Sequence, residues 1–226
     1  MKDTRASISL FSGAMGLDLG LLQAGIDIKL GQDFNAACVH TMEQNGHKAI
    51  LGDIRAIEPE QLLSAAGLTF GEPFIICGGP PCQPFSTAGK RLGINDPRGS
   101  LFREYVRMID AIRPRFFVME NVKGLMSSPL KDENGNNTTG KVIDVILDEF
   151  AKLHYKTVFG VLDAVYYGVP QFRERFVMIG SRDNEDIFLP LPTHFQTHQN
   201  AANRWVTLGD TIRDLENTPG ECAEFS

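Results

Sequence analysis

The sequence predicts an α/β fold: a mostly parallel sheet with helices on both faces. Short apolar stretches alternate with segments of helical periodicity up to about residue 182, and glycine, proline or acidic residues follow most of the apolar stretches. The composition, 42% hydrophobic and 22% charged over 226 residues, is that of an ordinary globular chain. Strands and helices that alternate in this way form parallel sheets covered on both sides.

Each element follows from its periodicity and its end signals. The clearest helix begins near Ser100, repeats apolar residues at helical spacing, and ends at Arg113-Pro114. Gly25 suits the end of a helix and Pro59 the first turn of one. In chain order we expect a strand at 8–11, a helix at 17–24, a strand at 28–30, a helix at 36–44, a strand at 49–51, a helix from 59, a strand at 74–77, a helix at 100–113, a strand at 116–119, a loop at 132–140, a helix at 142–150, and strands at 157–162 and 176–179.

The character of the chain changes after Arg182. Prolines and polar residues follow, with one short element expected within 205–215. We therefore expect a catalytic domain over 1–182 and an irregular segment over 183–226.

Charge and cysteine content exclude several classes of protein. The net charge of −6 argues against a chain that holds nucleic acid by electrostatics alone. The four cysteines form neither a CxxC pair nor a zinc pattern, so we expect no metal and no disulfide framework. No apolar stretch has the length of a membrane span, and the N-terminus is polar. A reduced cytoplasmic protein without membrane contact is expected.

Three strand ends carry residues suited to a ligand. A glycine-rich turn, Phe11-Ser12-Gly13-Ala14-Met15-Gly16, follows the first predicted strand, and Asp33 and Asp53 follow the second and third. Ligands of doubly wound folds bind beyond the carboxyl ends of strands, where glycine permits close backbone approach. Each feature is weak by itself, but together they favour a cofactor that contains a nucleoside. The turn lacks the GxGxxG pattern, which disfavours an NAD oxidoreductase.

A cysteine stands on a stiff turn at the same edge. Pro80 and Pro81 fix the backbone just before Cys82, where a nucleophile would be placed. A buried, inert thiol is the ordinary alternative. Glu120-Asn121 closes the fifth strand at this edge, and Arg173-Glu174-Arg175 precedes a later strand.

In this order, Pro-Pro-Cys82-Gln, Glu120-Asn121-Val and Gln171-x-Arg173-x-Arg175 resemble the cytosine-C5 DNA methyltransferases of bacterial restriction-modification systems. The segment from Leu10 to Gly16 resembles the cofactor motif of that family, and the likeness runs from Ser7 to about Arg182. The resemblance implies a class-I, Rossmann-like methyltransferase fold, S-adenosylmethionine as cofactor with S-adenosylhomocysteine as product, double-stranded DNA as partner, and a bacterial cytoplasmic, nucleoid-associated location.

The same resemblance assigns cofactor residues. Phe11 and Phe34 would cover the two faces of the adenine, Asp33 would hold the ribose, and Asp53 would accept a hydrogen bond from the adenine amino group. Most relatives have Glu where Asp33 stands. The remaining implied cofactor residues are Ser12, Gly13, Gly16, Ile54, Pro81 and Leu101.

It also assigns catalytic roles. The Cys82 thiolate would add to carbon 6 of a flipped-out cytosine, and Glu120 would serve ring N3. Asn121 would orient the base, Arg175 would bind its exocyclic oxygen, and Arg173 would support Glu120 or a phosphate. The implied DNA-contacting loop between Cys82 and Leu101 carries Gln83, Ser86, Lys90, Arg91 and Arg98.

Two family features are not found after Arg182, a target-recognition domain and a closing Gly-Asn-x-Val-Pro motif. We therefore expect a fragment, the catalytic subunit of a split enzyme with a separate C-terminal subunit, or a defective copy. Two other functions stay open: a tRNA cytosine-C5 methyltransferase, and a non-catalytic subunit that binds cofactor or regulates a partner.

Overall fold

The structure is a computed structural model that describes residues 5–81, 100–131, 137–197 and 200–217. Its contacts divide the chain into two compact units. The first comprises residues 1–160 and 176–189, and the second 161–175 and 190–226. The division expected at residue 182 stays a prediction.

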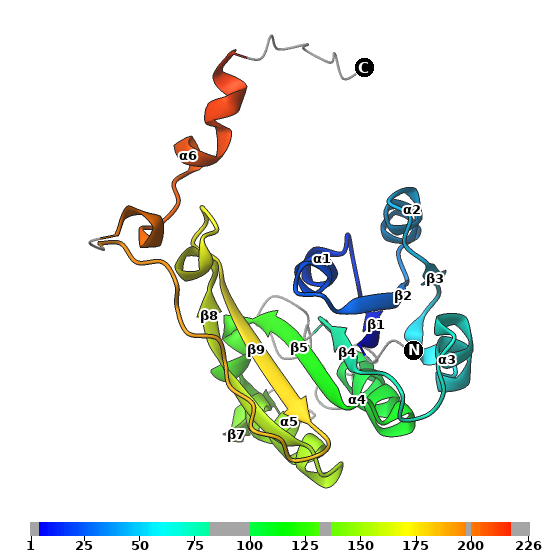
Figure 1. Ribbon diagram of the computed structural model, residues 1–226. Helices are drawn as coiled ribbons and strands as arrows, with labels where there is room; N and C mark the ends of the chain where they lie inside the picture. The colour runs from blue at the N-terminus through cyan, green and yellow to red at the C-terminus, as the bar shows by residue number, and fades with distance from the viewer. Residues whose placement is uncertain (1–4, 82–99, 132–136, 198–199, 218–226) are drawn as a thin grey trace. The chain divides into compact units, whose positions relative to one another are not determined.

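The described residues form a seven-stranded sheet with the strand order β3-β2-β1-β4-β5-β9-β8 (Figure 1). The first five of these strands in this order are joined by parallel pairings. The main-chain N–H of Arg182, after β9, donates to the carbonyl of Arg115, before β5, at 2.9 Å, so β9 runs antiparallel to β5. The strands are β1 (Ala6–Leu10), β2 (Asp27–Asp33), β3 (Ala49–Leu51), β4 (Ile75–Gly78), β5 (Phe116–Val122), β8 (Lys156–Asp163) and β9 (Glu174–Ser181).

Five of the six described helices lie between strands along the chain, and α6 follows the last strand. They are α1 (Gly16–Gln23), α2 (Ala36–Gln44), α3 (Pro59–Ala66), α4 (Ser100–Ile112), α5 (Val142–Lys152) and α6 (Leu208–Ile212). Short 3-10 turns lie at Ile54–Ala56, Lys123–Met126, Ala164–Tyr167, Ala201–Asn203 and Arg213–Asn217. The predicted helix at 36–44 and strand at 49–51 are confirmed with their bounds, and the short element expected within 205–215 is α6 with the turn after it.

One expectation about the chain is wrong. Residues 132–140 were expected to form a loop, but β7 (Asn137–Lys141) pairs antiparallel with β6 (Pro129–Lys131). These strands are short and largely polar, so their stability comes from pairing with each other, and hydropathy does not reveal it.

Both faces of the sheet are covered, as the sequence predicted. Alternate strand residues point to opposite faces. Phe117 and Met119 pack in the main core with buried residues of α3, α4 and α5, whereas Phe116 and Val118 pack in a second cluster with leucines of α1. Tyr105 is fully buried, and its hydroxyl lies 3.1 Å from the carbonyl of Ile76 and 3.0 Å from that of Val118, which ties α4 to β4 and β5.

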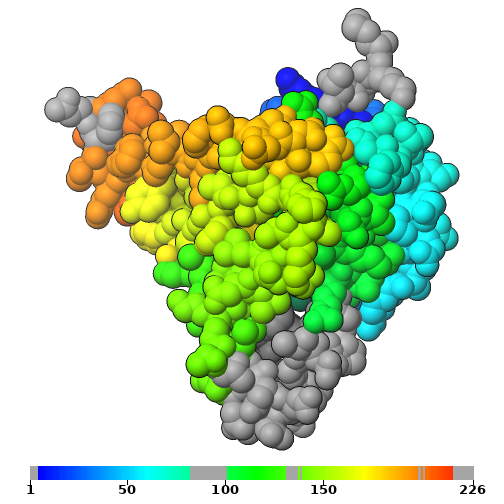
Figure 2. Space-filling view, turned by 90° about the horizontal axis from the view of Figure 1, so that it is seen from below, coloured from blue at the N-terminus to red at the C-terminus, as the bar shows by residue number. Residues whose placement is uncertain are grey.

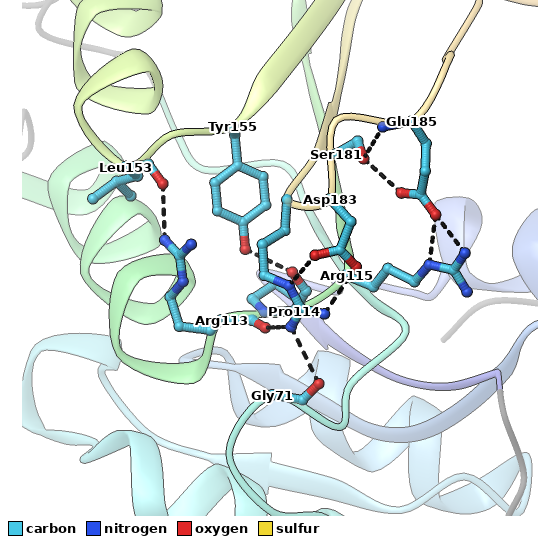
Figure 3. A network of polar contacts seen from close by, with 10 residues as sticks. Gly71, Arg113, Pro114, Arg115, Leu153, Tyr155, Ser181, Asp183 and Glu185 are labelled. Carbon is cyan, nitrogen blue, oxygen red and sulfur yellow. Dashed lines mark hydrogen bonds and ion pairs between the residues drawn. The ribbon is translucent and has the colours of Figure 1, made fainter.

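A network of arginines closes the sheet edge at the amino ends of the parallel strands (Figure 3). The Arg182 guanidinium donates to the carbonyls of Gly71 at 3.3 Å and Arg113 at 2.6 Å, and it pairs with Asp183 at 2.8 and 3.0 Å. The Arg113 guanidinium donates to the Leu153 carbonyl at 2.8 Å. Chain segments near residues 71, 113, 153 and 182, coloured teal, green, yellow-green and gold, come together on the face seen in Figure 2.

Candidate active site

The carboxyl ends of β1, β2 and β3 border a pocket in the first unit. The pocket opens to solvent, and its space counted together with the open solvent at its mouth is about 430 Å³. Six of the ten predicted cofactor residues line it, together with two residues that sequence reasoning missed. The lining consists of Phe11, Phe34, Asp53, Ile54, Pro81 and Leu101, and of Gln32 and Arg55.

The turn after β1 is held in an uncommon backbone conformation. Phe11, Gly13 and Met15 have φ angles of 54°, 55° and 65°, in the left-handed region that glycine adopts most readily. The main-chain N–H of Ser12 donates to the Gln32 carbonyl at 3.0 Å, which fixes the turn to β2. Gly16 begins α1, so it and the turn lie at one end of that helix.

A chain of hydrogen bonds through two serine hydroxyl groups links this turn to β2 and to the buried Asp18. Gln32 N–H donates to Ser12 Oγ at 3.3 Å, Ser12 Oγ donates to Ser9 Oγ at 2.8 Å, and Ser9 Oγ donates to Asp18 Oδ1 at 2.6 Å. Burial raises the pKa of the Asp18 carboxyl, although the hydrogen bond from Ser9 opposes the shift. Cys77, whose Sγ lies 3.6 Å from Asp18 Oδ1, is fully buried, and burial raises its thiol pKa, so it is suited to packing and not to nucleophilic attack.

Asp33, predicted to hold a ribose, already organises two backbone segments. Its Oδ2 accepts the N–H of Gly13 at 2.9 Å and its Oδ1 accepts the N–H of Asn35 at 2.9 Å. Asp33 is buried, with 8% of its surface exposed. Each carboxylate oxygen retains further lone-pair capacity for a ligand hydroxyl.

Asp53, predicted to face the adenine, is paired with Arg55. Its Oδ1 accepts from the Arg55 main-chain N–H at 3.0 Å and from Arg55 Nε at 2.9 Å, and Arg55 Nη2 donates to Oδ2. The hydrogen bonds from Arg55 hold the pKa of the Asp53 carboxyl below its ordinary value. The pocket therefore presents an ionised acceptor within an otherwise largely apolar lining.

The turn after β4 lies against Glu120. A Cβ atom added to Gly78 would come within 2.5 Å of the Leu10 carbonyl oxygen, so β1 and β4 approach closely only because residue 78 is glycine. A Cβ on Gly79 would lie 3.2 Å from Glu120 Oε2. Asn121 is buried, and its Nδ2 donates to the Pro80 carbonyl at 2.8 Å. Glu120 and Asn121 therefore border the backbone that leads into residue 82.

Other predicted site residues lie outside the described residues or in the second unit. Cys82 and the predicted DNA-contacting residues Gln83, Ser86, Lys90, Arg91 and Arg98 lie outside the described residues. Arg173 precedes β9, Arg175 is its second residue, and both belong to the second unit. The Arg173 N–H donates to Asp163 Oδ1 at 2.8 Å, and Arg175 Nη1 donates to the Glu174 carbonyl at 2.9 Å. The functional roles of all these residues stay predictions.

Gln32 and Arg55 had only faint sequence signals. Gln32 is a polar residue inside a strand that is buried on both sides, and Arg55 stands two positions after a predicted ligand residue. Because buried polar side chains are hydrogen-bonded, a glutamine inside a covered strand indicates a partner on a neighbouring segment.

The described residues contain neither a metal-binding cluster nor a membrane-spanning helix. No group of three or more His, Cys, Asp or Glu side chains in those ranges is placed to hold a metal ion. No helix there has the length and apolar character needed to cross a membrane.

A mostly parallel sheet with a pocket at the carboxyl ends of its first strands is typical of α/β proteins that bind nucleotide cofactors. The sequence matches the C-5 cytosine-specific DNA methylase family over residues 6–224. The chain belongs to this family, which confirms the resemblance found in its motifs and the fold that it implied.

Curated relatives include the Type II methyltransferase M.AquIA of Picosynechococcus sp., 39% identical over 85% of this chain and 78% of its own length. M.FnuDI of Fusobacterium nucleatum is 43% identical over 80% of this chain and 48% of its own length. M.NgoFVII of Neisseria gonorrhoeae is 36% identical over 92% of this chain and 52% of its own length. The chain thus spans about half the length of the last two relatives.

Solved structures share the fold. A protein encoded within an E. coli prophage superposes with a TM-score of 0.68 at 25% identity, over 92% of this chain and 54% of that one. The Dnmt2 methyltransferase of S. pombe superposes with a TM-score of 0.61 at 20% identity, over 81% of this chain and 51% of that one.

Proposed function

We propose that the protein is the catalytic part of a DNA cytosine-5 methyltransferase that uses S-adenosylmethionine. The observation that carries this proposal is the pocket that joins Phe11, Asp53 and Leu101 beside the turn leading to Cys82. Family membership over residues 6–224 supports the same reaction class.

The pocket residues fit an adenine nucleoside. Phe11 and Phe34 offer aromatic faces for stacking, and Ile54 and Leu101 offer apolar contact. The ionised Asp53 accepts from an exocyclic amine, and Asp33, which also accepts the Gly13 N–H, accepts from the ribose hydroxyls. When bound, S-adenosylmethionine supplies an electrophilic methyl group on its sulfonium sulfur.

The chain's own residues then prepare the cytosine. The Cys82 thiolate adds to carbon 6 of a flipped-out base, and the displaced ring electrons make carbon 5 nucleophilic. Glu120 shares a proton with ring N3 and so limits the charge that develops on the ring. After carbon 5 has gained the methyl group, a base removes its proton and the thiolate leaves. Asn121 orients the base, Arg175 binds its exocyclic oxygen, and Arg173 supports Glu120 or a phosphate.

Double-stranded DNA is the proposed partner, held in part by the loop that carries Lys90, Arg91 and Arg98. The net charge of −6 leaves only local cations for phosphate contacts, which gives weak and salt-sensitive binding. A separate polypeptide that supplies base-edge contacts and closes the cofactor pocket is therefore proposed as a second partner.

The test measures cofactor binding and methyl transfer separately. Calorimetry with S-adenosylhomocysteine is expected to show binding to the folded chain, and no binding at millimolar ligand would refute the cofactor proposal. Tritiated methyl transfer is expected on DNA once the C-terminal half of a relative such as M.FnuDI is added, and little transfer without it. Transfer to tRNA in place of DNA would identify the alternative substrate, and binding without transfer in any mixture would identify a non-catalytic subunit.

A further inference from the structure

We propose that Gln32 is a positioning residue that sets the spacing between the two turns bordering the cofactor pocket. The inference rests on the proposed function, because it concerns the same pocket. Gln32 lies on β2 between two parallel neighbours: it pairs with Leu10 of β1 and with Ile50 of β3. Its place in the sheet is therefore directly between the turn that carries Phe11 and the turn that carries Asp53.

One buried amide connects these two turns. Gln32 Nε2 donates to the Gly52 carbonyl at 2.7 Å, and Gln32 Oε1 accepts the N–H of Phe11 at 3.4 Å. Gln32 is 1% exposed, so water does not replace either partner readily. Because Gly52 immediately precedes Asp53, the amide holds the predicted stacking residue and the predicted adenine acceptor at a fixed separation.

The two contacts require opposite hydrogen-bonding character. A carbonyl oxygen at Gly52 needs a donor, and the N–H of Phe11 needs an acceptor. A carboxylate of the same shape supplies only acceptors, so it would meet the Gly52 carbonyl with like partial charge. A protonated carboxyl regains one O–H donor and so reproduces both contacts.

The substitution Gln32→Glu therefore makes the role of the amide dependent on pH. Burial raises the pKa of an introduced carboxyl and brings its titration toward the neutral range. The surrounding ionisable groups are Asp33 and Asp53 with its partner Arg55, and Asp18 at the far end of the hydroxyl chain. Since the wild-type protein contains the same groups, its own pH profile corrects for them.

The experiment measures the affinity of the full chain for S-adenosylhomocysteine by calorimetry at pH 5.5 and pH 8.5. At pH 8.5 Gln32→Glu is expected to bind roughly 10-fold or more weakly than wild type, as the loss of a buried hydrogen bond with charge repulsion implies. At pH 5.5 its affinity should return to within about threefold of wild type. Gln23→Glu, an exposed substitution at the end of α1, is the matched control and should follow wild type at both pH values.

Gln32→Leu tests the same role without a buried charge, in case Gln32→Glu does not fold. It carries no charge and leaves both turns without their link, so it should bind roughly 10-fold more weakly at both pH values. Urea unfolding of each variant establishes that folded protein is being titrated. Binding within twofold of wild type by either variant at pH 8.5, or weak binding by folded Gln32→Glu without recovery at pH 5.5, overturns the inference. Absence of binding by wild type would instead overturn the proposed cofactor.

Discussion

The two edges of the sheet in the first unit are built from different chemistry. At the carboxyl ends of β1, β2 and β3, hydroxyl, amide and carboxylate side chains form hydrogen bonds with the backbone of these strands and of the turns that follow them. At the opposite edge, three arginines, Arg113, Arg115 and Arg182, bind carbonyls and carboxylates in a dense network (Figure 3).

This difference indicates that the carboxyl-end edge serves ligand binding and that the arginine edge serves the stability of the fold. Short side chains such as those of Ser12 and Asp33 hold their turns from within the sheet and leave the space above them open to a ligand. Long arginine side chains cover the other edge and join segments far apart in sequence, including residues 71 and 182. Substitutions at the carboxyl-end edge should therefore change ligand binding and chemistry, and substitutions at the arginine edge should change the free energy of unfolding.

The largest effect is expected at Cys82. In a reconstituted, active enzyme, Cys82→Ser should lower methyl transfer by roughly a thousandfold or more, because serine lacks the thiolate that adds to carbon 6. Wild-type protein should also form a covalent adduct with DNA containing 5-fluorocytosine, since fluorine at carbon 5 blocks elimination. Cys38→Ser, on α2, is the control and should retain activity. Full activity of Cys82→Ser would show that the nucleophile is another group.

The next effect concerns the ligand pocket. Asp53→Ala removes the acceptor paired with Arg55, and the affinity for S-adenosylhomocysteine should fall by roughly 10- to 100-fold, as for a hydrogen bond to a charged group. Calorimetry measures the change, and urea unfolding serves as the control for folding. Methionine resembles the amino-acid part of the ligand and lacks the adenine. Its own affinity, measured by competition, should therefore change little. Unaltered affinity for S-adenosylhomocysteine would remove Asp53 from the proposed site.

The third prediction concerns the arginine edge. Arg182→Ala leaves the carbonyls of Gly71 and Arg113 without their shared donor, and the free energy of unfolding should fall by about 2 kcal/mol. Cofactor affinity should stay within about twofold, because the variant lies at the other edge of the sheet. Lys152→Ala, which removes an exposed cation of α5 with two surface ion pairs, is the matched control and should change little. An Arg182 variant with normal stability and weakened cofactor binding would reverse the comparison.

The sequence predicts the bounds of an element well where the signals for them lie within that element. The helix at 36–44 was predicted with its bounds because Asn45-Gly46 marks its end in the sequence. The structure adds that Asn35 caps its start, accepting the Ala37 N–H at 2.9 Å. The strand predicted at 28–30 is β2 from Asp27 to Asp33, which is longer than its apolar run. Its polar end is extended because it pairs with β1 and β3, and hydropathy along one segment does not contain that pairing.

The site was predictable to the same degree. Phe11, Asp53 and Leu101 were expected from motif resemblance, and they line one pocket. Gln32 was missed because its partners, Phe11 and Gly52, lie 21 and 20 residues away and contribute main-chain groups that no side-chain motif records. The pair formed by Asp53 and Arg55 was missed for a different reason: adjacent opposite charges in a loop are common, and only the pocket gives them significance.

The smallest expected effect tests whether the buried Asp18 carboxyl, at the end of the hydroxyl chain, is ionised in the folded protein. Asp18 is 1% exposed, and its Oδ2 is buried with no hydrogen-bond partner among the described residues. Burial raises its pKa in the folded protein above the unfolded value of about 3.9. The folded state therefore holds this proton more tightly, and the resulting stability is fully present below about pH 4 and is lost as pH rises through the folded pKa.

Asp18→Asn keeps the oxygen that accepts from Ser9 and has the shape of the protonated acid, but it does not ionise. Urea unfolding should therefore find the two proteins similar near pH 4, and the variant more stable than wild type at pH 8. Asp148→Asn, on the exposed side of α5, controls for the loss of one negative charge. If wild type instead gained stability over Asp18→Asn as the pH rose, Asp18 would be ionised in the folded protein, and the carboxyl-end edge would depend on a buried charge just as the opposite edge depends on its arginines.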